Sequence, residues 1–149
     1  MRRRRLRAFL VLLTSSVVLS AANPRLVDGV SGAPVEWSDW VSKRGPVAVL
    51  VWASWAPDAI TTIDRYPALK AACEEKGLNL VLLDVQETLE EGRRALSDRE
   101  IAWLHDRHGA LLKRYRVIDV PSLLIVAADG ESLGRLAAVP DEVDRWKSP

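Results

Sequence analysis

Continuous apolar runs separated by polar turns organise the chain. Val47 to Trp52 and Leu78 to Val85 are almost unbroken aliphatic runs, rich in valine and leucine. Runs of this kind predict strands that are covered on both faces. Another apolar run, Ser122 to Ala127, leads through the turn sequence Ala128-Asp129-Gly130-Glu131 into a last strand, Ser132 to Ala137. The pattern therefore predicts a sheet with buried central strands and a C-terminal hairpin.

A helix is predicted between the first two of these strands. Pro57 is tolerated in a first helical turn, and the carboxylate of Asp58 favours the positive end of the helix dipole. Pro67 should kink this helix, and Gly77 should end it. The order strand, helix, strand implies a right-handed parallel crossover, and therefore an α/β fold. The apolar stripe of the helix comprises Ile60, Ile63, Tyr66, Leu69 or Lys70, and Cys73.

The segment that follows the second strand has two interpretations. Thr88 to Leu96 is predicted to be helical. Ser97 and Glu100 then have the spacing of a capping box, which would start a further helix at Ile101. The alternative is a short strand from Ile101 to Leu104, and the local pattern favours neither.

The first 22 residues have the three parts of an export signal. Arginines at positions 2 to 5 and 7 precede an apolar stretch from residue 8 to residue 19, and the small residues Ser20, Ala21 and Ala22 follow. We therefore expect an exported protein that is periplasmic, secreted or anchored outside the cytoplasm. Cleavage after Ala22 fits the pattern. The alternative is an uncleaved membrane anchor at 8–19, although a bilayer span usually needs about 20 apolar residues.

Length and composition indicate one globular domain after this signal. The chain has 149 residues, of which 48% are hydrophobic and 28% charged. The expected division is 1–22 as signal or anchor, 23–45 as the mature N-terminal segment and 46–149 as the folded domain. Without the five signal arginines, 16 basic and 20 acidic residues remain, a net charge of about −4. No basic stripe remains, so we expect no nucleic-acid partner.

Two motifs flank the predicted central strands. Residues 52–59 are Trp-Ala-Ser-Trp-Ala-Pro-Asp-Ala, and residues 115–122 are Tyr-Arg-Val-Ile-Asp-Val-Pro-Ser. From about residue 46 to residue 136 the chain resembles the thioredoxin-like superfamily, especially its exported thiol-disulfide branch of TlpA-like and redoxin-like proteins. The first motif of that branch is typically Trp-Ala-x-Trp-Cys-x-x-Cys. The resemblance implies a thioredoxin-like three-layer fold, with a central mixed sheet, helices on both faces, and a cis proline, Pro121, in the loop before the C-terminal hairpin.

The departures from this family concern its reaction. Ala56 and Ala59 occupy the positions of the family's two cysteines, and Cys73 is the only cysteine of the chain. Dithiol exchange needs an attacking thiolate and a second thiol that resolves the mixed disulfide, so this chain cannot perform it intramolecularly. Leu50 stands where many thioredoxins carry a buried carboxylate, and Pro67 lies about one helical turn later than the family's kink proline. We predict no catalytic residue, no metal ligand and no cofactor.

The resemblance implies a binding surface instead, formed by Trp55, Pro57, Val120 and Pro121. Family members pair the backbone beside the cis proline with an extended peptide, so a cis bond between Val120 and Pro121 implies a peptide-binding edge. The alternative is that the proline only shapes a turn. An exposed Trp55 would be an anchor for a protein partner. Packing of Trp55 against the neighbouring loop is the alternative.

Other residues capable of chemistry have structural interpretations. Cys73 lies near the C-terminal end of the helix stripe, where the dipole disfavours a thiolate, so a structural role is expected. His105 and His108, with Asp106 beside them, are of metal-ligating types. The sequence offers no third strong ligand to join the two histidines, so a solvated turn is expected. The charged run from Glu87 to Arg94 predicts a solvated helix face.

Three functional hypotheses follow from the sequence. The first is an exported, redox-inactive module for protein binding or assembly, acting through the surface around Trp55, Ala56 and Pro121. The second is a thiol-disulfide oxidoreductase of the thioredoxin-like family whose cysteines have been replaced by alanine. The third is a peroxidase or regulator that uses Cys73 alone.

Overall fold

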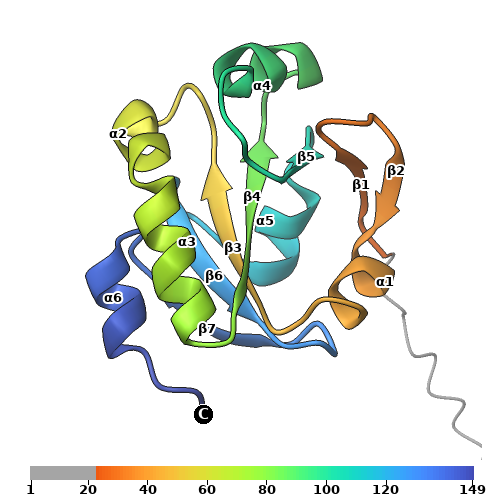
Figure 1. Ribbon diagram of the computed structural model, residues 1–149. Helices are drawn as coiled ribbons and strands as arrows, with labels where there is room; N and C mark the ends of the chain where they lie inside the picture. The colour runs from red at the N-terminus through yellow and green to blue at the C-terminus, as the bar shows by residue number, and fades with distance from the viewer. Residues whose placement is uncertain (1–22) are drawn as a thin grey trace, which may run out of the picture.

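A mixed sheet of seven strands organises residues 23–149, the residues that the computed structural model describes (Figure 1). The expected signal or anchor at 1–22 lies outside the described residues. The strand order is β2-β1-β5-β4-β3-β6-β7. The strands are β1 (Arg25–Asp28), β2 (Pro34–Glu36), β3 (Val47–Trp52), β4 (Asn79–Val85), β5 (Trp103–Asp106), β6 (Ser122–Val126) and β7 (Ser132–Leu136). The helices are α1 (Trp37–Ser42), α2 (Ala59–Asp64), α3 (Tyr66–Glu75), α4 (Leu89–Leu96), α5 (Ala110–Tyr115) and α6 (Pro140–Arg145).

Parallel pairing at the centre of the sheet confirms the predicted crossover. β3 pairs in parallel with β4, and β4 with β5. β6 runs antiparallel to β3, and β7 antiparallel to β6, which forms the predicted hairpin. β1 runs antiparallel to both β2 and β5, so residues before position 46 build one edge of the same sheet. The α/β class and the mixed sheet are therefore as predicted.

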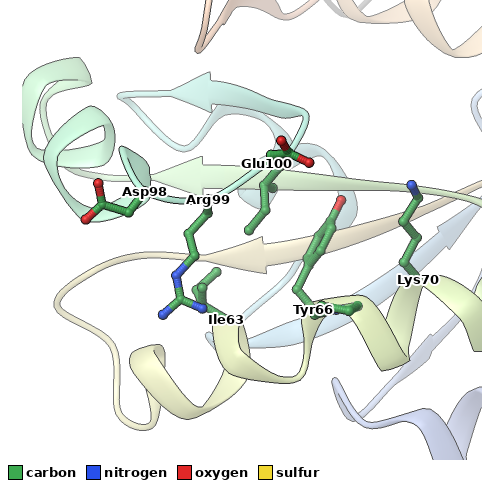
Figure 2. Close-up of a pocket in the computed structure, with 8 residues that line it drawn as sticks. Ile63, Tyr66, Lys70, Asp98, Arg99 and Glu100 are labelled. Atoms are coloured by element: carbon green, nitrogen blue, oxygen red, sulfur yellow. The ribbon is translucent and has the colours of Figure 1, made fainter.

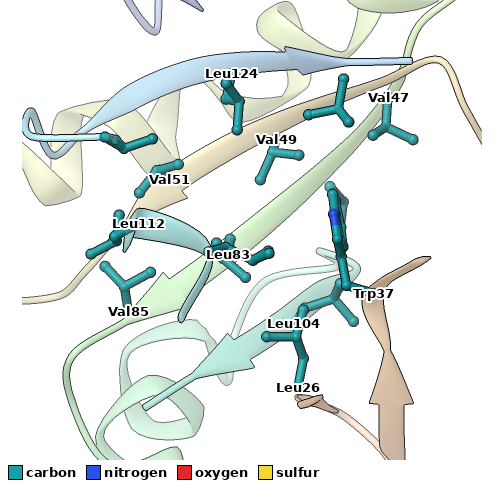
Figure 3. Close-up of a cluster of buried hydrophobic side chains, with 14 of the residues drawn as sticks. Leu26, Trp37, Val47, Val49, Val51, Leu83, Val85, Leu104, Leu112 and Leu124 are labelled. Carbon is teal, nitrogen blue, oxygen red and sulfur yellow. The ribbon is translucent and has the colours of Figure 1, made fainter. Parts of the chain in front are cut away.

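Helices cover both faces of the sheet, and alternate side chains of β3 therefore enter two separate hydrophobic cores. All six residues of β3 are buried. Val47, Val49 and Val51 face the core on the side of α1 and α5, where Figure 3 shows them with Trp37 and Leu112. The second core, on the side of α2, α3 and α6 (Figure 1), contains Ala48, Leu50, Trp52, Ile63, Leu69, Cys73 and Val143.

Two short helices replace the single kinked helix that was predicted after β3. α2 ends at Asp64 and α3 begins at Tyr66, so Pro67 lies in the first turn of α3, where its missing N–H is harmless. The expected stripe is wrong at Ile60, which is 75% exposed, because it lies in the first turn of α2 on the solvent side. The longest helix in residues 23–149, α3, has 10 residues, and none there is long and apolar enough to span a membrane.

Tertiary pairing decides the segment that had two interpretations. Trp103 to Asp106 forms β5, which lies between β4 and β1, so the alternative of a helix starting at Ile101 is wrong. The capping box lies earlier than predicted. Thr88 N donates to Glu91 Oε2 at 2.7 Å, and Glu91 N donates to Thr88 Oγ1 at 3.2 Å, which together start α4.

A hydrogen-bonded aromatic pair joins α1 to the C-terminal half of the chain. Trp37 Nε1 donates to Tyr115 Oη at 2.8 Å, and that hydroxyl donates to Gly130 O at 2.7 Å in the hairpin turn. The Trp37 side chain is fully buried. These bonds fix α1, α5 and the β6–β7 turn relative to one another.

Candidate binding site at the carboxyl ends of the central strands

The sheet brings three loops together at one end of its central strands. β3 and β4 are parallel, so their carboxyl ends lie side by side, and β6 begins at the same end because Ser122 pairs with Val51. The loops that follow Trp52 and Val85 therefore meet the loop that precedes Ser122. The peptide bond between Val120 and Pro121, in this last loop, is cis.

Ala56 and Ala59 lie where the loop after β3 turns into α2. Ala56 N donates to Ala53 O at 3.1 Å, and Ala59 N donates to Ala56 O at 3.3 Å. Asp58 precedes the helix with φ of 57°, a left-handed conformation that aspartate tolerates better than most residues. Both alanine side chains are only 6% exposed. Their methyl groups close the ends of the two cores and offer neither a nucleophile nor a proton donor.

Beside these alanines, the three loops enclose a groove of about 530 Å³, which we call the Trp55 groove. Its apolar lining consists of Trp55, Ile118 and Val120 together with the buried side chains of Leu112 and Val117. Trp55 is 53% exposed and Ile118 is 84% exposed, although both are large apolar side chains. Of the two interpretations of Trp55, the structure therefore favours the exposed one.

Three polar side chains complete the lining of the Trp55 groove. They are Gln86, from the loop after β4, and Lys113 and Arg116, from the C-terminal end of α5. The sequence did not identify these residues or Ile118, because the groove combines segments that are some 30 residues apart.

The predicted binding residues do not all share this groove. Trp55 and Val120 line it together. Pro121 instead lines a separate hollow of about 380 Å³ between the start of α2 and residues 137–139. Pro57 is exposed and lines neither the groove nor that hollow.

A buried carboxylate holds the loop that carries Trp55. Ser54 N donates to Glu87 Oε1 at 3.0 Å, and Ser54 Oγ donates to Glu87 Oε2. Glu87 is only 9% exposed and precedes α4, so the expectation of a solvated helix face is wrong at this residue. The two-point contact fixes the backbone directly before Trp55.

Asp84 and His105 form a second buried polar contact next to Glu87. His105 Nδ1 lies 2.9 Å from Asp84 Oδ2, and both residues are buried on neighbouring strands. Burial, reinforced by Glu87, raises the pKa of Asp84 to about 9, and burial lowers the pKa of His105. At neutral pH both groups are therefore uncharged, and a hydrogen bond between neutral partners joins Asp84 Oδ2 to His105 Nδ1.

The expectation of a solvated turn at residues 105–108 is therefore wrong for its first two members. Asp106 ends β5 in a buried position, and its carboxylate accepts hydrogen bonds from Ala110 N and Leu111 N, both at 2.9 Å. It satisfies free N–H groups at the start of α5. Among residues 23–149, no three histidine, cysteine, aspartate or glutamate side chains lie close enough together to hold a metal ion.

A hollow of about 320 Å³ on the other side of the molecule is lined by charged side chains of both signs, among them Asp98 and Glu100. Figure 2 shows Tyr66 and Lys70 projecting from α3 toward the segment that contains Arg99 and Glu100. Arg99 is paired with Asp64 at 2.8 Å, and Lys70 with Glu74 at 3.7 Å. Burial raises the pKa of Tyr66 to about 12, so its phenol stays protonated.

Comparison with known proteins identifies the fold. No family model and no curated protein matches the chain. Among solved structures, it is similar to a secreted Mycobacterium tuberculosis disulfide oxidoreductase homologous to E. coli DsbE, with 21% identity over 82% of this chain and 92% of the other and a TM-score of 0.58. The fold is thioredoxin-like.

Two further structures share this thioredoxin-like fold. A putative thiol:disulfide interchange protein DsbE from Chlorobium tepidum is 19% identical over 78% of this chain and 82% of its own, with a TM-score of 0.61. A thiol:disulfide interchange protein from Bacteroides sp. is 15% identical over 83% and 86%, with a TM-score of 0.63.

The thioredoxin-like fold is thus present in a chain that has a single cysteine, and that cysteine lies away from the reactive positions. Cys73 is fully buried near the end of α3. Burial, and to a smaller extent Glu74, raises the pKa of its thiol to about 11. The thiol is protonated at neutral pH and has no access to solvent, which is unsuited to nucleophilic chemistry.

Proposed function

We propose that this chain is an exported thioredoxin-fold protein that performs no thiol-disulfide chemistry and binds an extended segment of a partner protein in the Trp55 groove. The observation that carries the proposal is the pair of exposed apolar side chains, Trp55 and Ile118, beside a groove whose neighbouring reactive positions hold alanine. A scaffold that has lost its reaction but displays an aromatic anchor is suited to binding.

The energy available at this groove is sufficient for a specific contact. A buried tryptophan covers roughly 200 Å². Covering the exposed half of Trp55 would therefore remove about 100 Å² of mostly apolar surface from water, which is worth about 2.5 kcal/mol at about 25 cal/mol per Å². Ile118, which is more exposed, adds a comparable contribution. Ser54 and Glu87 hold the Trp55 loop in advance, so binding spends little free energy on ordering it.

The test compares partners recovered with matched variants of the full chain. Trp55→Ser removes the anchor, and Ile60→Ser removes an even more exposed apolar residue that does not line the groove. After crosslinking in the native host, we expect a defined partner with the parent chain and with Ile60→Ser, and its loss with Trp55→Ser. Identical partner sets from all three proteins would show that the groove is not the binding surface.

The absence of redox activity has its own test. The full chain should show no dithiol turnover in a disulfide-reductase assay with insulin as substrate, because one thiol cannot both attack and resolve. Turnover above that of a Cys73→Ser variant would contradict this part of the proposal.

The alternative function is a thiol-disulfide oxidoreductase whose cysteines have been replaced by alanine, and the names of the structural neighbours favour it. The genomic codons for positions 56 and 59 decide the matter. Cysteine codons at both positions would make the natural protein an oxidoreductase, and alanine codons would eliminate this alternative.

Export is the remaining element of the proposal, and it rests on the signal pattern in residues 1–22. Fractionation of the native host, followed by N-terminal sequencing of the recovered protein, tests it. We expect an extracytoplasmic protein that starts at Asn23. A full-length protein in the membrane fraction would favour the anchor, and a cytoplasmic protein would refute export.

A further inference from the structure

The Trp55 groove combines an apolar centre with a cationic rim. Lys113 lies in the last turn of α5, and Arg116 is the residue directly after the helix, with φ of 52°; both line the groove. They are the only charged side chains that line the groove within residues 23–149. Neither forms an ion pair with a carboxylate in that part of the chain, in contrast to Arg99 and Arg145.

This local charge is opposite to the charge balance of the rest of the fold. Residues 23–149 contain 20 acidic and 16 basic residues. At physiological ionic strength, charges farther than about 8 Å are largely screened, so a ligand in the groove is influenced mainly by Lys113 and Arg116. Asp119 belongs to the adjoining loop, but it does not line the groove.

We propose that the Trp55 groove selects an acidic extended segment of its partner, an inference that rests on the proposed function and specifies its ligand. An apolar or aromatic side chain lies between Trp55 and Ile118, and flanking aspartate or glutamate side chains meet Lys113 and Arg116. Gln86 supplies a carboxamide that can both donate to and accept from the backbone of the segment. The apolar contact provides affinity, and the two cations provide the selection.

Fluorescence anisotropy of labelled peptides with the full chain tests the proposal. The probes are three twelve-residue peptides with one central phenylalanine, flanked by glutamate, serine or lysine, and a fourth with glutamates but no phenylalanine. Lys113→Glu/Arg116→Glu reverses the rim charge. Arg94→Glu/Lys147→Glu is the matched control, because it changes the net charge equally at exposed positions outside the groove. Trp55→Ser removes the anchor.

We expect the glutamate peptide to bind most tightly and the lysine peptide least tightly. An exposed ion pair changes affinity by roughly 1.5- to 5-fold, so the rim reversal should weaken glutamate-peptide binding about tenfold, with tighter binding of the lysine peptide. The control should change neither affinity by more than about twofold.

The outcomes separate this inference from the proposed function. Equal binding of the glutamate and serine peptides, both lost in Trp55→Ser, would overturn the acidic selection and leave the groove as a binding site. Equal binding of the two glutamate peptides would also overturn it, because the apolar contact would then be irrelevant. If the control lost as much affinity as the rim variant, the net charge of the protein, and not the two cations of the groove, would explain the selection, and the proposal would be overturned. Failure of every peptide to bind would refute the proposed function itself.

Discussion

Asp84 makes the stability of this fold depend on pH in the direction opposite to that of most carboxylates. Its side chain is fully buried, and burial raises its pKa from an ordinary 3.8 to about 9. Between these two values the folded state keeps the Asp84 proton and the unfolded state has lost it. The contribution of Asp84 to stability is therefore complete below pH 4 and decreases as pH rises toward 9.

The Asp84→Asn variant isolates this contribution. An amide has the shape of the protonated carboxyl, can donate to or accept from His105 Nδ1 and does not titrate. Between pH 4 and pH 9, the free energy of unfolding of the parent chain falls by about 1.4 kcal/mol per pH unit relative to that of the variant. From pH 5 to pH 8, the stability difference should therefore change by about 4 kcal/mol in favour of Asp84→Asn.

Urea unfolding followed by tryptophan fluorescence at pH 5, 6, 7 and 8 measures the difference. His105 acts in the opposite sense, because burial lowers its pKa and stability is lost as pH falls below its ordinary 6.5. It is present in both proteins, so its effect cancels. Glu75→Gln, at an exposed carboxylate, should show a constant difference. A pH-independent difference for Asp84→Asn as well, with the parent chain the more stable, would indicate that Asp84 is ionised in the folded protein and refute the reasoning.

Three further predictions follow from the packing. Cys73, buried and with a pKa of about 11, should react with a thiol reagent at neutral pH only after unfolding, and rapid labelling of the native protein would revive the single-thiol hypothesis. Tyr115→Phe leaves the buried Trp37 N–H without its acceptor and should lower the free energy of unfolding by about 1–3 kcal/mol in urea; an unchanged value would mean that the bond contributes nothing. Gly92→Ala places a methyl group against Asp84 Oδ2 and should lower Tm despite the higher helix propensity of alanine, so a raised Tm would contradict the packing.

The sequence predicted the elements whose signals are local. Val47 to Trp52 was predicted with the bounds that the structure has, because a strand buried on both faces needs an uninterrupted apolar run. The alanine pair was located because its motif follows that strand directly. Ile60 was misplaced because the helix starts only one residue before it, and an apolar residue in a first turn can face solvent.

Features that depend on distant pairing were either left open by the sequence or not predicted. The capping box at Ser97 and Glu100 had the right spacing, but pairing with β4 and β1 makes Trp103 to Asp106 a strand. Glu87 belonged to a charged run, and nothing in that run indicates that its carboxylate binds Ser54, 33 residues earlier. The groove likewise combines three loops that only the sheet brings together.

The two alanines in the loop after β3 would also determine how the proposed partner leaves the Trp55 groove. A thiol at position 56 would allow a covalent link to a partner cysteine, and its lifetime would then depend on the supply of other thiols. With a methyl group there and with Cys73 enclosed, occupancy of the groove by the proposed partner would depend only on the concentration and the affinity of that partner. The proposed partner should therefore be bound to the same extent in reducing and in oxidising surroundings.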